Sequence, residues 1–142
     1  TLLMHIICNY IPLSTYDTII LINKFVNFNI IIIFATGMEI IFAKNYLKEL
    51  YLEGMTHERR YRFQKDIIRR YQKAIDRMAA ARRPEDLMRI NSLRYEKLKG
   101  NKNGISSVRV SDKYRIEFEE MKIRGEEAIV IFNILELSNH YQ

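Results

Sequence analysis

Residues Ile105 to Phe118 read ISSVRVSDKYRIEF and contain the clearest structural pattern of the chain. Apolar and polar residues alternate on both sides of the centre of this stretch, which is the pattern of two half-buried β-strands. Between them stands Ser111-Asp112-Lys113, whose polar residues tolerate tight backbone geometry. The stretch therefore predicts a β-hairpin with one face toward a core.

The length of the hairpin loop fixes which side chains face each other. A three-residue loop pairs Val108 with Ile116 and keeps the apolar residues on one face, whereas a two-residue loop would mix the faces. Arg109 then lies directly opposite Arg115, a like-charge pairing that costs about 0.2–1 kcal/mol. Either both guanidinium groups extend into water, or together they hold an anion such as phosphate, which suits arginine geometry.

The segments before the hairpin contain one strand and several helices. The apolar run at residues 38–43 predicts a strand, and residues 44–53 predict a helix that Gly54 caps. Residues 62–82 predict the longest helix, which Pro84 ends before a short second helical turn. The apolar stripe of the long helix consists of Phe63, Ile67, Tyr71, Ile75 (or Ala74) and Met78.

Alternating patterns continue on both sides of the hairpin. They predict further strands over residues 95–98 and 128–137. The complete order is an N-terminal strand, two to three helices, then an antiparallel sheet of three to four strands. This order predicts an α+β domain with the helices on one face of the sheet.

Charge is unevenly distributed along the chain. The 142 residues include 23 Lys and Arg and 17 Asp and Glu, for a formal net charge of +6. Residues 1–37 contain only Asp17 and Lys24 as charged residues, so all of the net charge lies after them. The basic excess favours a nucleic-acid partner.

Residues 1–37 differ from the rest in composition, with ten Ile and neither Glu nor Arg. Their most apolar stretch, Ile19 to Ala35, is 17 residues long and is interrupted by Asn23, Lys24, Asn27 and Asn29, whereas a membrane span needs about 20 mostly apolar residues. We therefore expect a hydrophobic leader outside the functional domain, which would occupy residues 38–142. A membrane anchor is the alternative.

Several enzyme classes lack their motifs in this chain. Cys8 is the only cysteine, which excludes an internal disulfide and a cysteine-based zinc cluster. The sequence has no H-E-x-x-H, G-x-S-x-G or phosphate-loop motif, so metalloproteases, α/β-hydrolases and P-loop kinases are not expected. We expect neither a metal nor another cofactor. His140, three residues past the last predicted strand, is the candidate proton carrier because imidazole titrates near neutral pH.

The longer stretch from Tyr95 to Phe118, YEKLKGNKNGISSVRVSDKYRIEF, resembles the signature of the HigB-type toxins in the RelE superfamily. Those proteins have a Leu-Lys-Gly turn, a strand, a short polar turn and an aromatic-Arg-Ile strand. The strand that opens at Met38 and the closing strand followed by a histidine agree as well. The resemblance covers residues 38–142 and leaves out the leader.

The resemblance implies a RelE-like fold and a ribosome-dependent endoribonuclease, an mRNA interferase. Such a toxin acts in the cytoplasm on messenger RNA, contacts ribosomal RNA, and is silenced by a helix-turn-helix antitoxin. The expected catalytic residues are Lys99, Arg109, Arg115 and His140. The expected RNA-binding residues are Tyr95, Lys102, Asn139 and Tyr141.

The sequence departs from the family pattern in two places. Family members commonly end in Asp-Tyr-His, where this chain has Ser138-Asn139-His140, and some carry a histidine where Glu96 stands. The assignment of acid and base therefore stays open.

Three alternatives also stay open. A gyrase-inhibiting toxin of the ParE kind has the same fold and needs no catalytic histidine. A noncatalytic nucleic-acid-binding module would use the basic helix, and a membrane-tethered protein would use residues 1–37.

Overall fold

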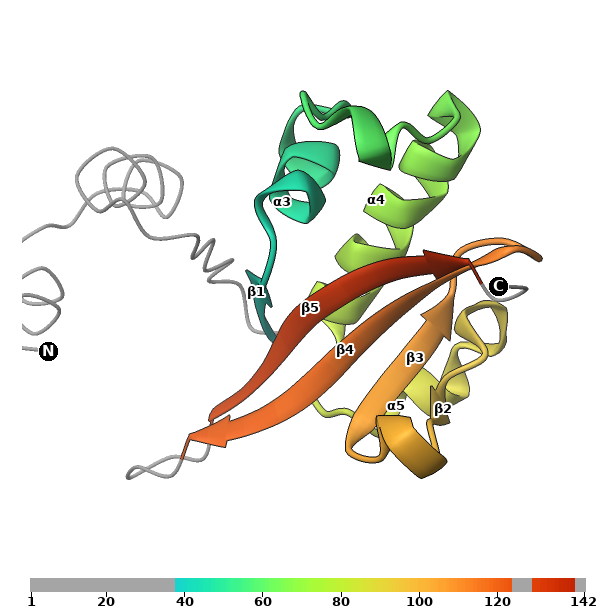
Figure 1. The fold of residues 1–142 in the computed structure, drawn as a ribbon. Helices are drawn as coiled ribbons and strands as arrows, with labels where there is room; N and C mark the ends of the chain where they lie inside the picture. Colours follow the sequence, from blue (N-terminus) through green and yellow to red (C-terminus); the bar gives the residue numbers. More distant parts are fainter. Residues whose placement is uncertain (1–37, 124–128, 140–142) are drawn as a thin grey trace, which may run out of the picture.

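The computed structural model describes residues 38–123 and 129–139 (Figure 1). They form a five-stranded sheet in the order β1-β5-β4-β3-β2. The strands are β1 (Glu39–Phe42), β2 (Glu96–Lys97), β3 (Ile105–Arg109), β4 (Tyr114–Ile123) and β5 (Ile129–Asn139). β1 runs parallel to β5, and the other neighbours are antiparallel. The predicted α+β class is confirmed, while the leader lies outside the described residues.

Three helices pack on one side of this sheet (Figure 1). They are α3 (Asn45–Leu52), α4 (Lys65–Ala80) and α5 (Asp86–Arg89). Alternate strand residues such as Ile40, Ile116 and Phe132 are fully buried between the sheet and the helices. The opposite side of the sheet, which we call the open face, carries the polar residues of the same strands. No helix among the described residues is long and apolar enough to span a membrane.

The hairpin has the predicted register. Val108 pairs with Ile116, and Arg109 pairs with Arg115. The buried Val108, Ile116 and Phe118 all point to the helix side. The register between β4 and β5 shifts once, between Glu117 and Phe118. β5 extends to Asn139, beyond the predicted end of that strand, and β2 is shorter than predicted.

The long helix starts three residues later than predicted, because the chain before it is held in another conformation. Arg59–Tyr61 form a 3₁₀ turn, and the Tyr61 ring stacks on Tyr46 with centroids 3.6 Å apart. The rings of Phe63 and Tyr114 pack in a T-shaped arrangement with centroids 5.5 Å apart. Once the helix starts, Ile68 rather than Ile67 is fully in the core.

The C-terminal ends of α4 and α3 have different features. After α4 ends at Ala80, the backbone amides of Arg82 and Arg83 donate hydrogen bonds to the carboxylate of Asp86. Gly54 follows α3 with a φ of +68°, as expected for a residue that ends a helix in the left-handed conformation. The predicted cap is therefore confirmed.

Candidate active site

The open face gathers ionisable groups from three adjacent strands. In the region where β2, β3 and β4 lie side by side, Glu96 pairs with Ser107, and Ser107 pairs with Glu117. Arg109 and Arg115 form the next pair along the same two strands. Since side chains alternate across a strand, these five residues point to the same side of the sheet.

Arg115 is the centre of this group, because its side chain is only 11% exposed. Its Nε donates to Ser107 Oγ at 2.9 Å, and its Nη2 donates to the Arg94 carbonyl at 2.8 Å. Arg94 turns this carbonyl toward the site from a left-handed backbone conformation, with a φ of +41°. The guanidinium is therefore held in one orientation before any ligand binds.

Glu96 supplies the countercharge. Its Oε1 lies 3.0 Å from Nη2 of Arg115 and accepts a hydrogen bond from Ser107 Oγ at 3.3 Å. Burial lowers the pKa of Arg115, the Glu96 carboxylate opposes that shift, and the nearby Arg109 adds to it. Arginine keeps its proton at neutral pH despite such shifts.

Arg109 has a different partner from Arg115. It pairs with Asp112 in the hairpin turn, whose side chain is 85% exposed. The like-charge pairing across the strands is thus offset by two separate carboxylates of the protein, those of Glu96 and Asp112. These two partners were not predicted from the sequence, where water and an external anion were the alternatives.

The two predicted lysines lie on the loop between β2 and β3. Lys102 Nζ lies 2.7 Å and 2.9 Å from the two carboxylate oxygens of Glu117, whose side chain is 12% exposed. Lys102 therefore neutralises Glu117, which lies at one end of the row of open-face residues. Lys99 is exposed and has no hydrogen-bond or ion-pair partner among the residues that the structure describes.

Tyr95 lies apart from the two arginines. Its partly buried ring packs toward Phe118 on the helix side, and its hydroxyl donates to Glu120 at 2.5 Å. Burial raises the pKa of Tyr95 to about 12, and the bond to Glu120 adds to the shift. The structure does not bring this ring to the open face.

The C-terminal candidates are only partly described. Ser138 pairs with Arg115 and donates to its carbonyl at 3.4 Å, while Asn139 pairs with Tyr114. His140 and Tyr141 lie outside the described residues. β5 therefore reaches the strand position of Arg115 at Ser138, two residues before the predicted histidine.

Sequence reasoning left Glu96 out of the predicted site. The available signal was the alternation of β2, which puts Glu96 on the opposite face from Tyr95. Ser107 was also missed, because a buried serine has no sequence signature of its own. No group of three or more His, Cys, Asp or Glu among the described residues could hold a metal ion.

Comparison with known proteins identifies the family of the chain. A family model described as the RelE-like toxin of type II toxin-antitoxin system HigB matches residues 40–132. No curated protein matches the chain significantly. Among solved structures, the chain is similar to a YoeB/ParE toxin from Agrobacterium tumefaciens, with 15% identity and a TM-score of 0.43 over 73% of this chain and 100% of that one. Because the family model matches well over half of its length, the chain belongs to the HigB-type, RelE-like toxins of type II toxin-antitoxin systems.

Proposed function

We propose that this toxin is a ribosome-dependent endoribonuclease that cleaves translated messenger RNA in the cytoplasm. Membership of a type II toxin-antitoxin family implies an antitoxin partner, and we propose that this partner is a helix-turn-helix protein. The observation that carries the nuclease proposal is the enclosed, pre-oriented Arg115 beside Glu96 and Arg109 on the open face.

The chemistry of RNA cleavage explains why such a guanidinium would matter. Attack of a ribose 2′-oxygen on the adjacent phosphate builds negative charge on the phosphorane oxygens. Fixed cations aimed at that charge lower the barrier without reorganising during the reaction. Arg115 is fixed by Ser107 and the Arg94 carbonyl, and Arg109 lies opposite it. We assign both arginines to charge stabilisation, with the exposed Lys99 as a third cation.

Cleavage also needs one group to remove a proton and another to return one. We assign the Glu96 carboxylate, 3.0 Å from Arg115, to remove the proton from the 2′-hydroxyl. We assign the His140 imidazolium to protonate the leaving 5′-oxygen, so that the products are a 2′,3′-cyclic phosphate and a free 5′-hydroxyl. These side chains supply both proton transfers, so the proposed reaction uses no metal.

The remaining predicted residues would bind the RNA strand. Lys102 is tied to Glu117 beside the site and can contact a neighbouring phosphate. Tyr95 supports β2 from the helix side, so we assign base stacking to Tyr141 rather than to Tyr95. Asn139, at the end of β5, is the candidate for hydrogen bonding to a base edge.

The test is to map messenger RNA 5′ ends in bacteria after brief induction of the full chain. New cuts within translated regions are expected, and they should be absent with His140→Ala and with Glu96→Gln. Glu119→Gln is the matched control for Glu96→Gln. It makes the same change at an exposed position of β4 that also lies on the open face of the sheet. Growth arrest with intact messages would contradict the proposal and favour a gyrase-type target.

A further inference from the structure

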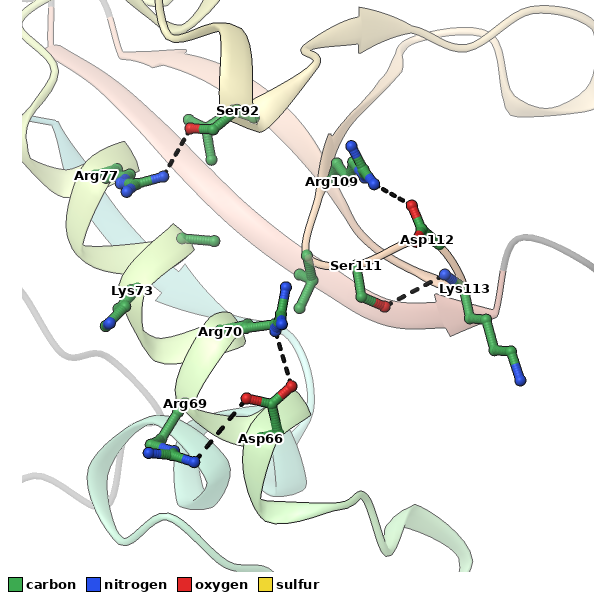
Figure 2. A pocket seen from close by; sticks show the side chains of 13 residues that line it. Asp66, Arg69, Arg70, Lys73, Arg77, Ser92, Arg109, Ser111, Asp112 and Lys113 are labelled. Carbon is green, nitrogen blue, oxygen red and sulfur yellow. Dashed lines mark hydrogen bonds and ion pairs between the residues drawn. The ribbon is translucent and has the colours of Figure 1, made fainter.

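A second charged feature lies between α4 and the hairpin turn. It is an open cavity of about 690 Å³ (Figure 2). The exposed face of α4 forms one wall, and the end of β3 with the Ser111–Lys113 turn forms the other. We call it the basic groove, after the six cationic residues in its lining: Arg69, Arg70, Lys73, Arg77, Arg109 and Lys113.

The groove has an excess of unneutralised positive charge. Among the described residues, only two carboxylates line it, those of Asp66 and Asp112. Asp66 pairs with Arg70 at 2.8 Å, and both side chains are more than half exposed, so this pairing contributes little and can yield to a ligand. Lys73 and Lys113 have no side-chain partner among the described residues. The groove is thus complementary to a polyanion.

The cations on α4 are spaced along the groove rather than gathered at one point. Arg70, Lys73 and Arg77 follow one another at three- and four-residue intervals, so they lie on one side of the helix. Seven residues of helix cover about 10 Å, which exceeds the size of a single phosphate. Figure 2 shows Arg70 reaching from α4 toward the hairpin turn, and Arg77 reaching toward Ser92, to whose Oγ it donates. A chain of phosphates fits this row better than an isolated anion.

Arg109 connects the groove with the strand pair of the candidate active site. It lines the groove and pairs across the strands with Arg115. Because α4 packs on the helix side and Arg115 points to the open face, an RNA strand bound in the groove would reach Arg115 by passing around the hairpin end of the sheet.

We infer that the basic groove binds the phosphate backbone of RNA and leads it to Arg115. This inference rests on the proposed nuclease function. Arginine offers paired N–H donors that match phosphate oxygens. A protein partner would need apolar anchors, yet none of the exposed large apolar side chains lines the groove. Those side chains are Leu52, Met55, Met88 and Met121.

The test measures binding without cleavage. The probe is a fluorescent 2′-O-methyl oligonucleotide of about 12 nucleotides, a length within the range of single-strand binding sites. It cannot be cut, because its 2′-oxygen carries no proton. Fluorescence anisotropy gives the Kd of the full chain at several salt concentrations. The test variant is Lys73→Ala/Arg77→Ala, and the control is Arg62→Ala/Lys65→Ala, which removes two exposed cations from the start of the same helix region but outside the groove.

The test variant should raise the Kd about tenfold at low salt, which is the scale of two exposed charge-assisted contacts. Its slope of log K against log salt should fall by about 1.4, since each phosphate contact on a single strand contributes about 0.7. The control should change the Kd by less than about twofold, and circular dichroism should show both variants folded.

Two further probes separate the possible partners. An RNA stem-loop of the same length distinguishes folded RNA from a single strand as the source of the backbone. A glutamate-rich peptide tests an acidic protein segment instead. Equal losses in test and control variants, or a larger loss for the peptide than for RNA, would overturn the inference. If the wild-type chain binds the oligonucleotide through the groove but cuts no RNA in cells, the nuclease proposal is refuted and RNA binding by the groove is not.

Discussion

Replacing Arg115 with Ala removes the cation on which the proposed site depends. The side chain is 11% exposed and makes two hydrogen bonds shorter than 3 Å, to Ser107 and to the Arg94 carbonyl. It also pairs with Glu96 at 3.0 Å. The substitution thus affects both stability and catalysis, and the two effects have different sizes.

The loss of stability should be moderate. Two hydrogen bonds from a charged donor contribute about 1.5–3 kcal/mol each when they are well shielded. The pair with Glu96 adds little, because the Glu96 side chain is 49% exposed. Removing the like charge opposite Arg109 returns about 0.2–1 kcal/mol. We expect a net loss of about 2–6 kcal/mol in the free energy of unfolding, compared with the total of about 5–15 kcal/mol of a typical domain.

The loss of catalysis should be much larger than unfolding can explain. Deleting one fixed donor to a developing oxyanion costs about 10²–10³ in rate. Arg115→Lys keeps the charge but loses the forked geometry, so it should recover only part of the rate. Arg62→Ala, which removes an exposed arginine before α4, should leave the rate unchanged.

The assay is single-turnover cleavage of a message on purified ribosomes, with products mapped by primer extension. Urea denaturation of the same preparations measures the folded fraction. If Arg115→Ala is folded and cuts at the wild-type rate, the reasoning that assigns Arg115 to phosphate stabilisation is refuted.

Three other substitutions test parts of the fold and its ionisation. Tyr71→Phe removes a buried hydrogen bond of 3.0 Å to the Leu47 carbonyl, so urea denaturation should show a loss of about 1 kcal/mol. The hydrogen bond from the Thr56 hydroxyl lowers the pKa of Glu49 below its unfolded value of 4.5. This contact therefore stabilises the fold above pH 4.5, and its contribution is lost as the pH falls through the lower pKa of the folded state. Thr56→Val should therefore raise the pKa of Glu49 in an NMR titration, and an unchanged value would refute this contact. Burial raises the pKa of Tyr95 from 10.0 to about 12, so its contribution is complete below pH 10.0 and is lost as pH rises through about 12. Tyr95→Phe should flatten the fall in unfolding free energy over that interval, whereas a parallel pH profile would count against the buried hydroxyl.

The hairpin shows how far local pattern can predict a site. Alternation of apolar residues and loop length were enough to place Arg109 opposite Arg115, because a one-residue shift would have exposed every buried side chain. The same pattern did not predict which groups offset the repulsion between the two arginines. Glu96 reaches Arg115 from β2, and only the assembled sheet brings the two together.

The start of the long helix, in contrast, could not be predicted from the local pattern. The periodicity of residues 62–82 predicted one long helix correctly, but its start moved to Lys65. Ring contacts made by Tyr61 and Phe63 with distant residues hold the preceding chain out of the helix. Such contacts have no counterpart in a local window of sequence.

The α+β class, the hairpin register and the basic face of α4 could be predicted from the sequence, because each depends on the spacing of neighbouring residues. That β1 lies parallel to β5 is seen only in the folded domain. The tertiary structure also decided that Tyr95 packs toward the helix side and that Arg115 is enclosed by Glu96 and Ser107. These features join residues far apart in the chain, and their energies depend on burial and distance, which exist only once the sheet and helices have packed together.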